Sequence, residues 1–162
     1  MHIKGWPLIA TLALFGCDDG VDDEPDASTS GADASISDAG APPYGDHVTE
    51  GLTLAGASGL LSLTMTEVVF QPPIRDDNVW SFELISEADG APTSGCEITL
   101  DPRMPAHGDH GTSKTPQISD LGDGLYRVTD VYLFMRGLWV VTLSAACEGV
   151  EDTFTLEVWI EG

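Results

Sequence analysis

Residues 138–160 read LWVVTLSAACEGVEDTFTLEVWI, and this stretch decides the fold class. Large apolar side chains alternate with polar or small ones on both sides of the Glu-Gly dipeptide at 148–149. A period of two indicates strands with one buried face, because successive side chains of a strand point to opposite faces. The apolar members are Trp139, Val141, Leu143, Phe154, Leu156 and Val158. The stretch predicts two strands, 138–146 and 153–160, joined by a turn.

The same pattern of short apolar runs and turn residues continues upstream to about Leu60. Short apolar runs are separated by turn dipeptides at 72–73, 89–90 and 123–124, and no long period of 3.6 residues appears. The runs predict further strands at 61–70, 79–86, 96–100, 117–119 and 125–134. About seven strands in roughly 100 residues is the size of an immunoglobulin-like sandwich. We therefore expect an all-β fold, an antiparallel sandwich with a single core over residues 60–162.

Residues 17–59 differ in composition. Between Cys17 and Glu50 there are ten acidic residues and no lysine or arginine, in a background of Ser, Ala, Gly and Pro. A segment with high charge and low hydrophobicity cannot bury enough apolar surface to offset the entropy of ordering. We expect an acidic disordered tether over 17–59.

The first 16 residues have the features of a secretion signal. Lys4 precedes a ten-residue apolar stretch at 6–15, which is too short to span a bilayer as a permanent anchor. Leu14-Phe15-Gly16-Cys17 resembles the lipobox of bacterial lipoproteins. That resemblance implies cleavage before Cys17, a diacylglyceryl group on its thiol, and a lipid-anchored protein of the cell envelope facing the extracytoplasmic side. The alternative is an ordinary signal peptide with an incidental cysteine.

Charge and motif content narrow the function class. The chain has 27 acidic and 6 basic residues, and loss of the signal removes only Lys4, so the mature net charge is 5 minus 27, or −22. Such a charge repels nucleic acid, and we expect no nucleic-acid partner. The sequence contains no Gly-rich phosphate loop, no serine elbow and no His-Glu-x-x-His helix. We expect a protein that is not an enzyme.

Two cysteines remain once Cys17 is lipidated. Export leads to an oxidising compartment, where an even pair favours a disulfide. Cys96 shares strand parity with Ile98 and Leu100, and Cys147 shares it with Val141, so both thiols are predicted to point inward. A Cys96–Cys147 disulfide is the expectation; two buried free thiols, or two soft metal ligands, are the alternatives.

Several short motifs occur in an order typical of a known family. They are Asp77-Asn78-Val79-Trp80, Asp89-Gly90-Ala91-Pro92, Met104-Pro105-Ala106-His107-Gly108-Asp109-His110-Gly111, Pro116, Gly124-Leu125-Tyr126 and Met135-Arg136-Gly137-Leu138-Trp139. Over residues 61–160 the chain resembles the YtkA-like domain, which is related to FixH-like domains of secreted and membrane-attached bacterial proteins. The resemblance implies an immunoglobulin-like sandwich, often encoded near copper-handling or respiratory-oxidase functions. Here Arg136 replaces a common proline, and Asp109 is inserted between two histidines.

The motifs also bring together soft and imidazole donors. Met104, His107, His110 and Met135 are the candidate metal ligands, with Asp101 and Asp109 as acceptors for a ring N–H. Thioether sulfur selects Cu(I), and imidazole binds copper or zinc, so copper is the expected metal if one is bound.

A second interpretation assigns these residues to a structural corner. In this interpretation both methionines fill the core, His107 forms a hydrogen bond with its own loop, and His110 is solvent-exposed. The domain is then a structural or protein-interaction module, with an envelope protein as its partner. Tyr126, near a strand start, is predicted to tie down a turn.

Overall fold

A computed structural model describes residues 48–161 of the chain. The predicted signal at 1–16, the lipidation of Cys17 and the part of the tether before Val48 lie outside the described residues.

Nine strands and one 3₁₀ turn form the described part of the chain. The 3₁₀ turn, η1, covers Pro105–His107 between the fourth and fifth strands. The strands are β1 (Thr53–Ala55), β2 (Leu61–Val68), β3 (Asp77–Ser86), β4 (Glu97–Met104), β5 (His110–Gly111), β6 (Gln117–Gly122), β7 (Leu125–Tyr132), β8 (Gly137–Cys147) and β9 (Val150–Ile160).

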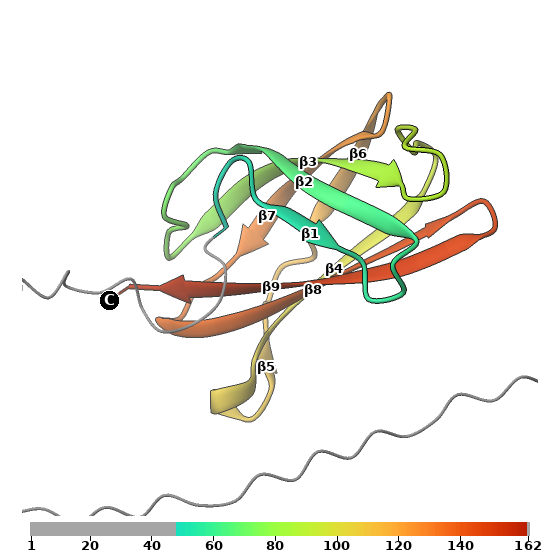
Figure 1. Ribbon diagram of the computed structural model, residues 1–162. Helices are drawn as coiled ribbons and strands as arrows, with labels where there is room; N and C mark the ends of the chain where they lie inside the picture. The colour runs from blue at the N-terminus through green and yellow to red at the C-terminus, as the bar shows by residue number, and fades with distance from the viewer. Residues whose placement is uncertain (1–47, 162) are drawn as a thin grey trace, which may run out of the picture. The chain divides into compact units, whose positions relative to one another are not determined.

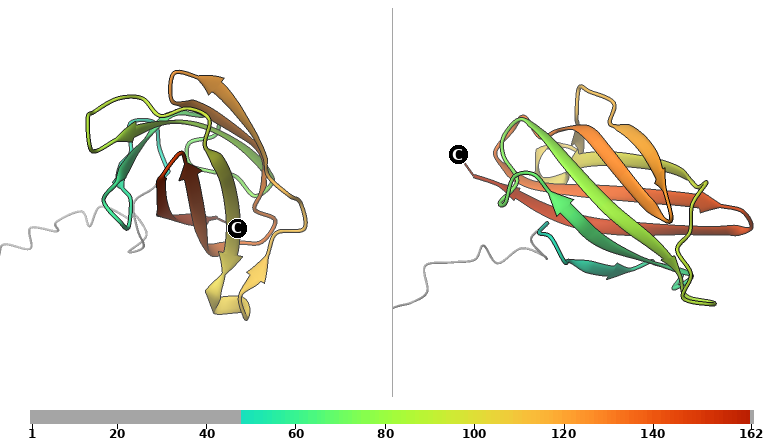
Figure 2. Two further views of the ribbon diagram at one scale, coloured as in Figure 1. Left: turned by 90° about the vertical axis from the view of Figure 1, so that its right-hand side faces the viewer. Right: turned by 90° about the horizontal axis from the view of Figure 1, so that it is seen from above.

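The strands form two antiparallel sheets packed face to face (Figures 1 and 2). One sheet has the order β1-β2-β3-β7-β6, and the other has the order β5-β4-β8-β9. The chain crosses between sheets after β3, after β5 and after β7, so two pairs of neighbouring strands, β3 with β7 and β4 with β8, are distant in sequence. The immunoglobulin-like antiparallel sandwich expected from the sequence is confirmed.

All seven predicted strands are present, and two further strands were missed. Of these, β5 has only two residues, too few for any periodicity to be read. The other, β1, lies inside the segment assigned to the tether, and Val48 before it is 1% exposed. The expected tether boundary at 59 was therefore wrong at its downstream end. Residues 48–59 contain too few apolar positions to predict a strand, and β1 forms because β2 offers it a free edge.

The core lies between the two sheets and contains the inward residues of every long strand. Trp139, Val141, Leu143, Phe154, Leu156 and Val158, predicted from their alternation, are all buried. Among the residues from 48 to 161, no helix has the length and apolar character needed to cross a membrane.

The sandwich has two ends that differ in construction. The end we call the pinned end holds Cys96, Cys147, Tyr126, Asp152 and the β1–β2 turn. The opposite end, the His/Met end, holds the tip of the β4–β5 hairpin, the β2–β3 loop at 69–76, the β7–β8 loop at 133–136 and Glu161.

Candidate functional site

The β4–β5 hairpin places two of the predicted ligands side by side. Met104 and His110 are directly opposed in the antiparallel register, so their side chains lie on the same face of the sheet. Met104 is fully buried, whereas His110 is exposed. The hairpin extends below the rest of the sandwich in Figure 1. The hairpin therefore places a buried thioether opposite an imidazole at the surface.

A cluster of aromatic rings contacts His110 from the β7–β8 side. The ring of Phe134 meets the ring of His110 edge-on at 5.7 Å and that of Trp139 edge-on at 5.8 Å. Tyr132 stacks on the other side of Phe134 with a centroid distance of 5.7 Å. Phe134 is thus the contact through which the β7–β8 loop reaches His110.

The Met-x-Gly-x-Trp motif has a local structural explanation. The indole N–H of Trp139 donates to the carbonyl of Met135 at 2.9 Å and closes the β7–β8 loop. Gly137 has φ +116°, and a Cβ on it would lie 3.2 Å from the terminal methyl of Met104. A side chain there would be strained and would press on the thioether. The motif therefore keeps space for Met104 as well as shaping the loop.

His107 and Met135 are not joined to that pair by comparable contacts. His107 ends the 3₁₀ turn and is exposed, and Gly108 after it takes a left-handed conformation. The Met135 side chain is partly buried against the core. Within residues 48–161, no hydrogen bond engages either imidazole ring. The structural-corner interpretation included such a bond from His107 to its own loop, and the described chain does not contain it. Its other expectations agree with the structure: Met104 is buried in the core, Met135 packs against the core, and His110 is exposed.

The predicted acceptors are also engaged elsewhere or exposed. Arg103 Nε donates to both carboxylate oxygens of Asp101, at 2.8 and 3.0 Å. Asp109 occupies the left-handed region with φ +59° beside the exposed imidazoles. In the described part of the chain, no group of three or more His, Cys, Asp or Glu side chains is arranged to hold a metal ion. Any site here would depend on methionine sulfur.

A clamp holds the strand that carries His110. Downstream of β5, Thr112 Oγ1 donates to the carbonyl of Tyr132 at 2.8 Å. Lys114 pairs with Asp77 and lies 4.5 Å above the ring of Tyr132. The hydrogen bond to Asp77, and then the nearby negative charges, raise the pKa of Lys114. Since β5 has only two residues, this clamp supplies much of its attachment to the fold.

The pinned end contrasts with this arrangement. The predicted disulfide joins Cys96, directly before β4, to Cys147 at the end of β8. The hydroxyl of Tyr126 donates to the carbonyl of Thr93 and accepts from the N–H of Cys96, both at 3.1 Å. Gly124 lies so close to β3 and to the β3–β4 crossover that a Cβ would be 2.8 Å from the Leu84 carbonyl oxygen and 3.0 Å from the Thr93 nitrogen. The Gly-x-Tyr motif therefore anchors a turn, as the sequence predicted.

Asp152 is a buried, hydrogen-bonded acidic residue on β9 that the sequence analysis did not single out. It is 3% exposed, and its carboxylate accepts four backbone N–H bonds, from Ser58, Leu60, Leu61 and Thr153. Burial raises its pKa, but these hydrogen bonds outweigh burial and the net pKa is lowered. A Cβ on Gly56 would lie 2.1 Å from the carboxylate, so the turn closes tightly over it. An inward-facing acid in an alternating strand was the available signal.

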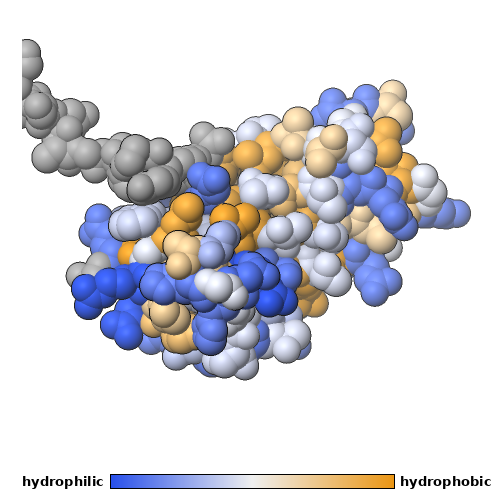
Figure 3. Space-filling model, turned by 90° about the horizontal axis from the view of Figure 1, so that it is seen from below, coloured by the Kyte–Doolittle hydropathy of each residue, from blue (hydrophilic) through white to orange (hydrophobic). Residues whose placement is uncertain are grey.

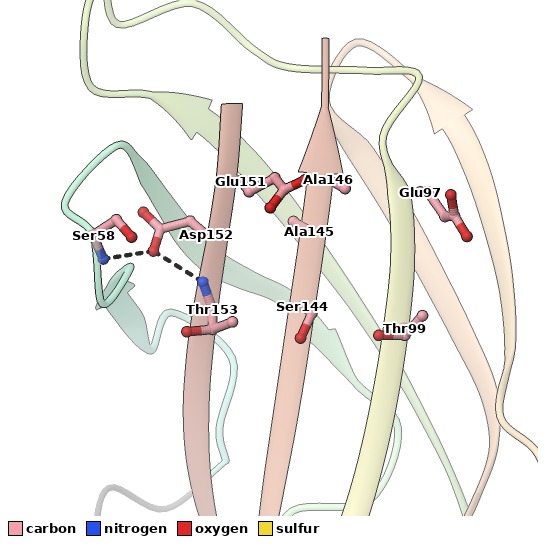
Figure 4. A pocket seen from close by; sticks show the side chains of 9 residues that line it. All are labelled: Ser58, Glu97, Thr99, Ser144, Ala145, Ala146, Glu151, Asp152 and Thr153. Atoms are coloured by element: carbon pink, nitrogen blue, oxygen red, sulfur yellow. Dashed lines mark hydrogen bonds between the residues drawn. The ribbon is translucent and has the colours of Figure 1, made fainter. Parts of the chain in front are cut away.

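A shallow pocket of about 550 Å³ lies beside Asp152 on the outer face of the β4-β8-β9 sheet (Figure 4). Thr99, Ser144 and Thr153 form one row across it, and Glu97 and Glu151 flank the next row. Figure 4 shows Asp152 turned away toward Ser58 and not into this hollow. The pocket lies at the pinned end and contains none of the predicted ligands.

The fold and the motif contacts define a class of small immunoglobulin-like domains with a His/Met hairpin. The model of the YtkA-like family matches residues 62–144. The chain belongs to the YtkA-like family, as its motifs indicated. Comparison with curated proteins and with solved structures gave no match.

Proposed function

We propose that this protein is a copper-binding module of the cell envelope, anchored to a membrane through acylated Cys17. Its role in this proposal is binding or delivery of the metal, without catalysis. The cross-strand pairing of Met104 with His110 is the observation that carries the proposal. His107 and Met135 are the further donors, on the hairpin turn and on the β7–β8 loop.

The donor chemistry favours Cu(I) over zinc. Zinc sites in proteins are built from cysteine, histidine and carboxylate groups, and residues 48–161 contain no cluster of three of these. A thioether with an imidazole is a set that suits Cu(I), since soft sulfur selects it. The ring nitrogens of His107 and His110 are free of hydrogen bonds within the described chain, which leaves them available as ligands.

Cu(I) affinity of the mature chain, measured by competition with a chromophoric chelator, tests the proposal. Met104→Leu keeps the volume of the side chain and removes only the sulfur, so it should lower Cu(I) affinity at least about tenfold with little loss of stability. Met65→Leu is the matched control, because Met65 is equally enclosed in the core but lies on β2. Its Cu(I) affinity should equal that of the wild type.

Histidine variants separate the two oxidation states. His110→Ala should weaken binding of both Cu(I) and Cu(II), whereas Met104→Leu should affect mainly Cu(I). His107→Ala measures whether the hairpin turn contributes a ligand. Wild-type affinity no tighter than that of an unrelated acidic protein would contradict the proposal.

The second candidate is a protein-interaction module with an envelope protein as partner. Val69, Phe70 and Ile74 favour it, since all three are exposed apolar side chains on one loop. Absence of specific copper binding together with capture of one defined partner, lost in a Phe70→Ser variant, would support this alternative.

A further inference from the structure

The β2–β3 loop at the His/Met end presents apolar side chains to solvent. Val69, Phe70 and Ile74 are 47%, 39% and 36% exposed. They line one groove with Pro72 and Pro73, and a second groove near Arg136 shares Glu161 with it. On the face of the domain in Figure 3, hydrophobic residues appear as separate patches among hydrophilic ones.

The loop is held rigidly in this exposed state. The side-chain amide of Asn78 bonds the N–H and carbonyl of Ile74 and the carbonyl of Asp76. Arg75 Nε donates to the carbonyl of Phe134 at 2.7 Å, which joins the loop to the β7–β8 loop. An apolar tip fixed in place in this way loses little conformational entropy when it is covered.

The charge of this end differs from that of the rest of the domain. Three of the five basic side chains in residues 48–161 pair with carboxylates: Arg103, Lys114 and Arg127. The other two, Arg75 and Arg136, line the two grooves. The acidic residues of this end are Asp76, Asp109 and Glu161. This end therefore has a net charge of 2 minus 3, or −1, whereas residues 48–161 together have 5 minus 18, or −13. Its repulsion from an anionic surface is correspondingly weaker than that of the rest of the domain.

The chain also enters the fold at this end. The N–H of Glu50 donates to the side-chain oxygen of Gln71 at 3.3 Å, so the residues before β1 reach the domain beside the apolar loop. Thirty residues, 18–47, separate Cys17 from Val48. Even fully extended they span only about 100 Å, so an anchor at Cys17 gives the domain a high local concentration at the bilayer.

From these observations we propose that the His/Met end docks on the surface of the phospholipid bilayer that holds the anchor. Val69, Phe70 and Ile74 enter the interfacial region, and Arg75 and Arg136 meet lipid phosphates. The inference rests on the proposed lipid anchoring. It predicts that the candidate copper ligands face the membrane and not the open periplasmic or external solvent.

Tryptophan quenching by lipids brominated in their acyl chains tests the orientation. The chain from Cys17 onward is coupled through that thiol to a maleimide lipid in phosphatidylcholine vesicles, since Cys96 and Cys147 are already bonded. The anchor is thus supplied chemically, and the outcome does not depend on acylation in the cell. Acylation itself is read separately from the intact mass of the exported protein.

Phe70→Trp and Leu121→Trp are the paired reporters, with wild-type emission subtracted. Leu121 is 58% exposed near the end of β6, beside the β6–β7 turn at the pinned end. Docking predicts several-fold stronger quenching of Phe70→Trp, reduced when Val69 and Ile74 are both replaced by serine in a variant with unchanged melting temperature. Equal quenching of the two reporters would overturn the proposal and leave the loop as a surface for a protein partner.

Discussion

Each end of the sandwich carries one motif of the family, Gly-x-Tyr at the pinned end and Met-x-Gly-x-Trp at the His/Met end. The two motifs have different roles. At the pinned end, the hydroxyl of Tyr126 both donates and accepts, and Gly124 packs against backbone. At the His/Met end, Gly137 and Trp139 shape a loop around Met104, but the imidazoles nearby take no hydrogen bond in the described chain. The comparison separates residues used for architecture from residues left available for ligands.

Burial alone does not make this distinction. Met104 and Tyr126 are both fully buried, and Cys96 is partly buried. What differs is whether the polar or soft atoms are already satisfied by the protein, because an unsatisfied donor or acceptor is free to meet a ligand. Substitutions at the pinned end should therefore change stability, and those at the His/Met end should change binding.

The largest expected effect on stability is removal of the disulfide. Cys96 and Cys147 are 51 residues apart, and closing a loop of that size should stabilise the fold by about 4 kcal/mol on the chain-entropy model. Replacing both with alanine should lower the free energy of unfolding by about that amount, measured by urea denaturation. A loss below about 1 kcal/mol would show that the other contacts of the pinned end hold it together without the disulfide.

Asp152 should make stability depend on acid pH. Its pKa is lowered in the folded state, so its contribution is complete above the unfolded value near 3.9 and is lost as pH falls through the folded pKa. Asp152→Asn should destabilise the protein by about 3 kcal/mol at neutral pH. The gap between wild type and variant should narrow below about pH 4. If the stability difference between wild type and Asp152→Asn were the same at neutral pH and below about pH 4, this account would be contradicted.

Tyr126→Phe should have a smaller effect. The change removes the hydroxyl that links the Cys96 N–H with the Thr93 carbonyl and leaves both groups without this partner. A loss of about 1.5 kcal/mol is expected from such unsatisfied groups. Hydrogen exchange of the Cys96 amide should accelerate in the variant, while the copper affinity stays that of the wild type. A change in copper affinity would break the proposed division between the ends.

His110→Ala should produce the smallest change in stability. The imidazole is exposed, and its recorded contact is the edge-on ring of Phe134. The expected loss of about 0.5 kcal/mol or less is typical of a surface position. Differential scanning calorimetry of the apo-protein measures it, and the copper titration of the same sample measures the ligand role. A large drop in melting temperature would assign His110 to the architecture.

Much of the candidate site was predictable, but its internal arrangement was not. Met104, His107, His110 and Met135 stand out in sequence because soft and imidazole donors recur within family motifs. Only the register of β4 with a two-residue strand shows that Met104 opposes His110 and that His107 stands apart on the turn. The short β5 carries no periodic signal, and it is held by Thr112 and Lys114, which the sequence did not single out.

The alternation in 138–160 determined by itself that these residues form strands with one buried face, because the period of a strand is local. Parity likewise predicted that both cysteines point inward, and the pairing of β4 with β8 brings them close enough to form the disulfide. The pairings of β3 with β7 and of β4 with β8 became known only from the tertiary structure, since each joins segments far apart in the chain. The carboxylate of Asp152 is the clearest case: its partners at Ser58, Leu60 and Leu61 are more than ninety residues away, and no local pattern encodes such a contact.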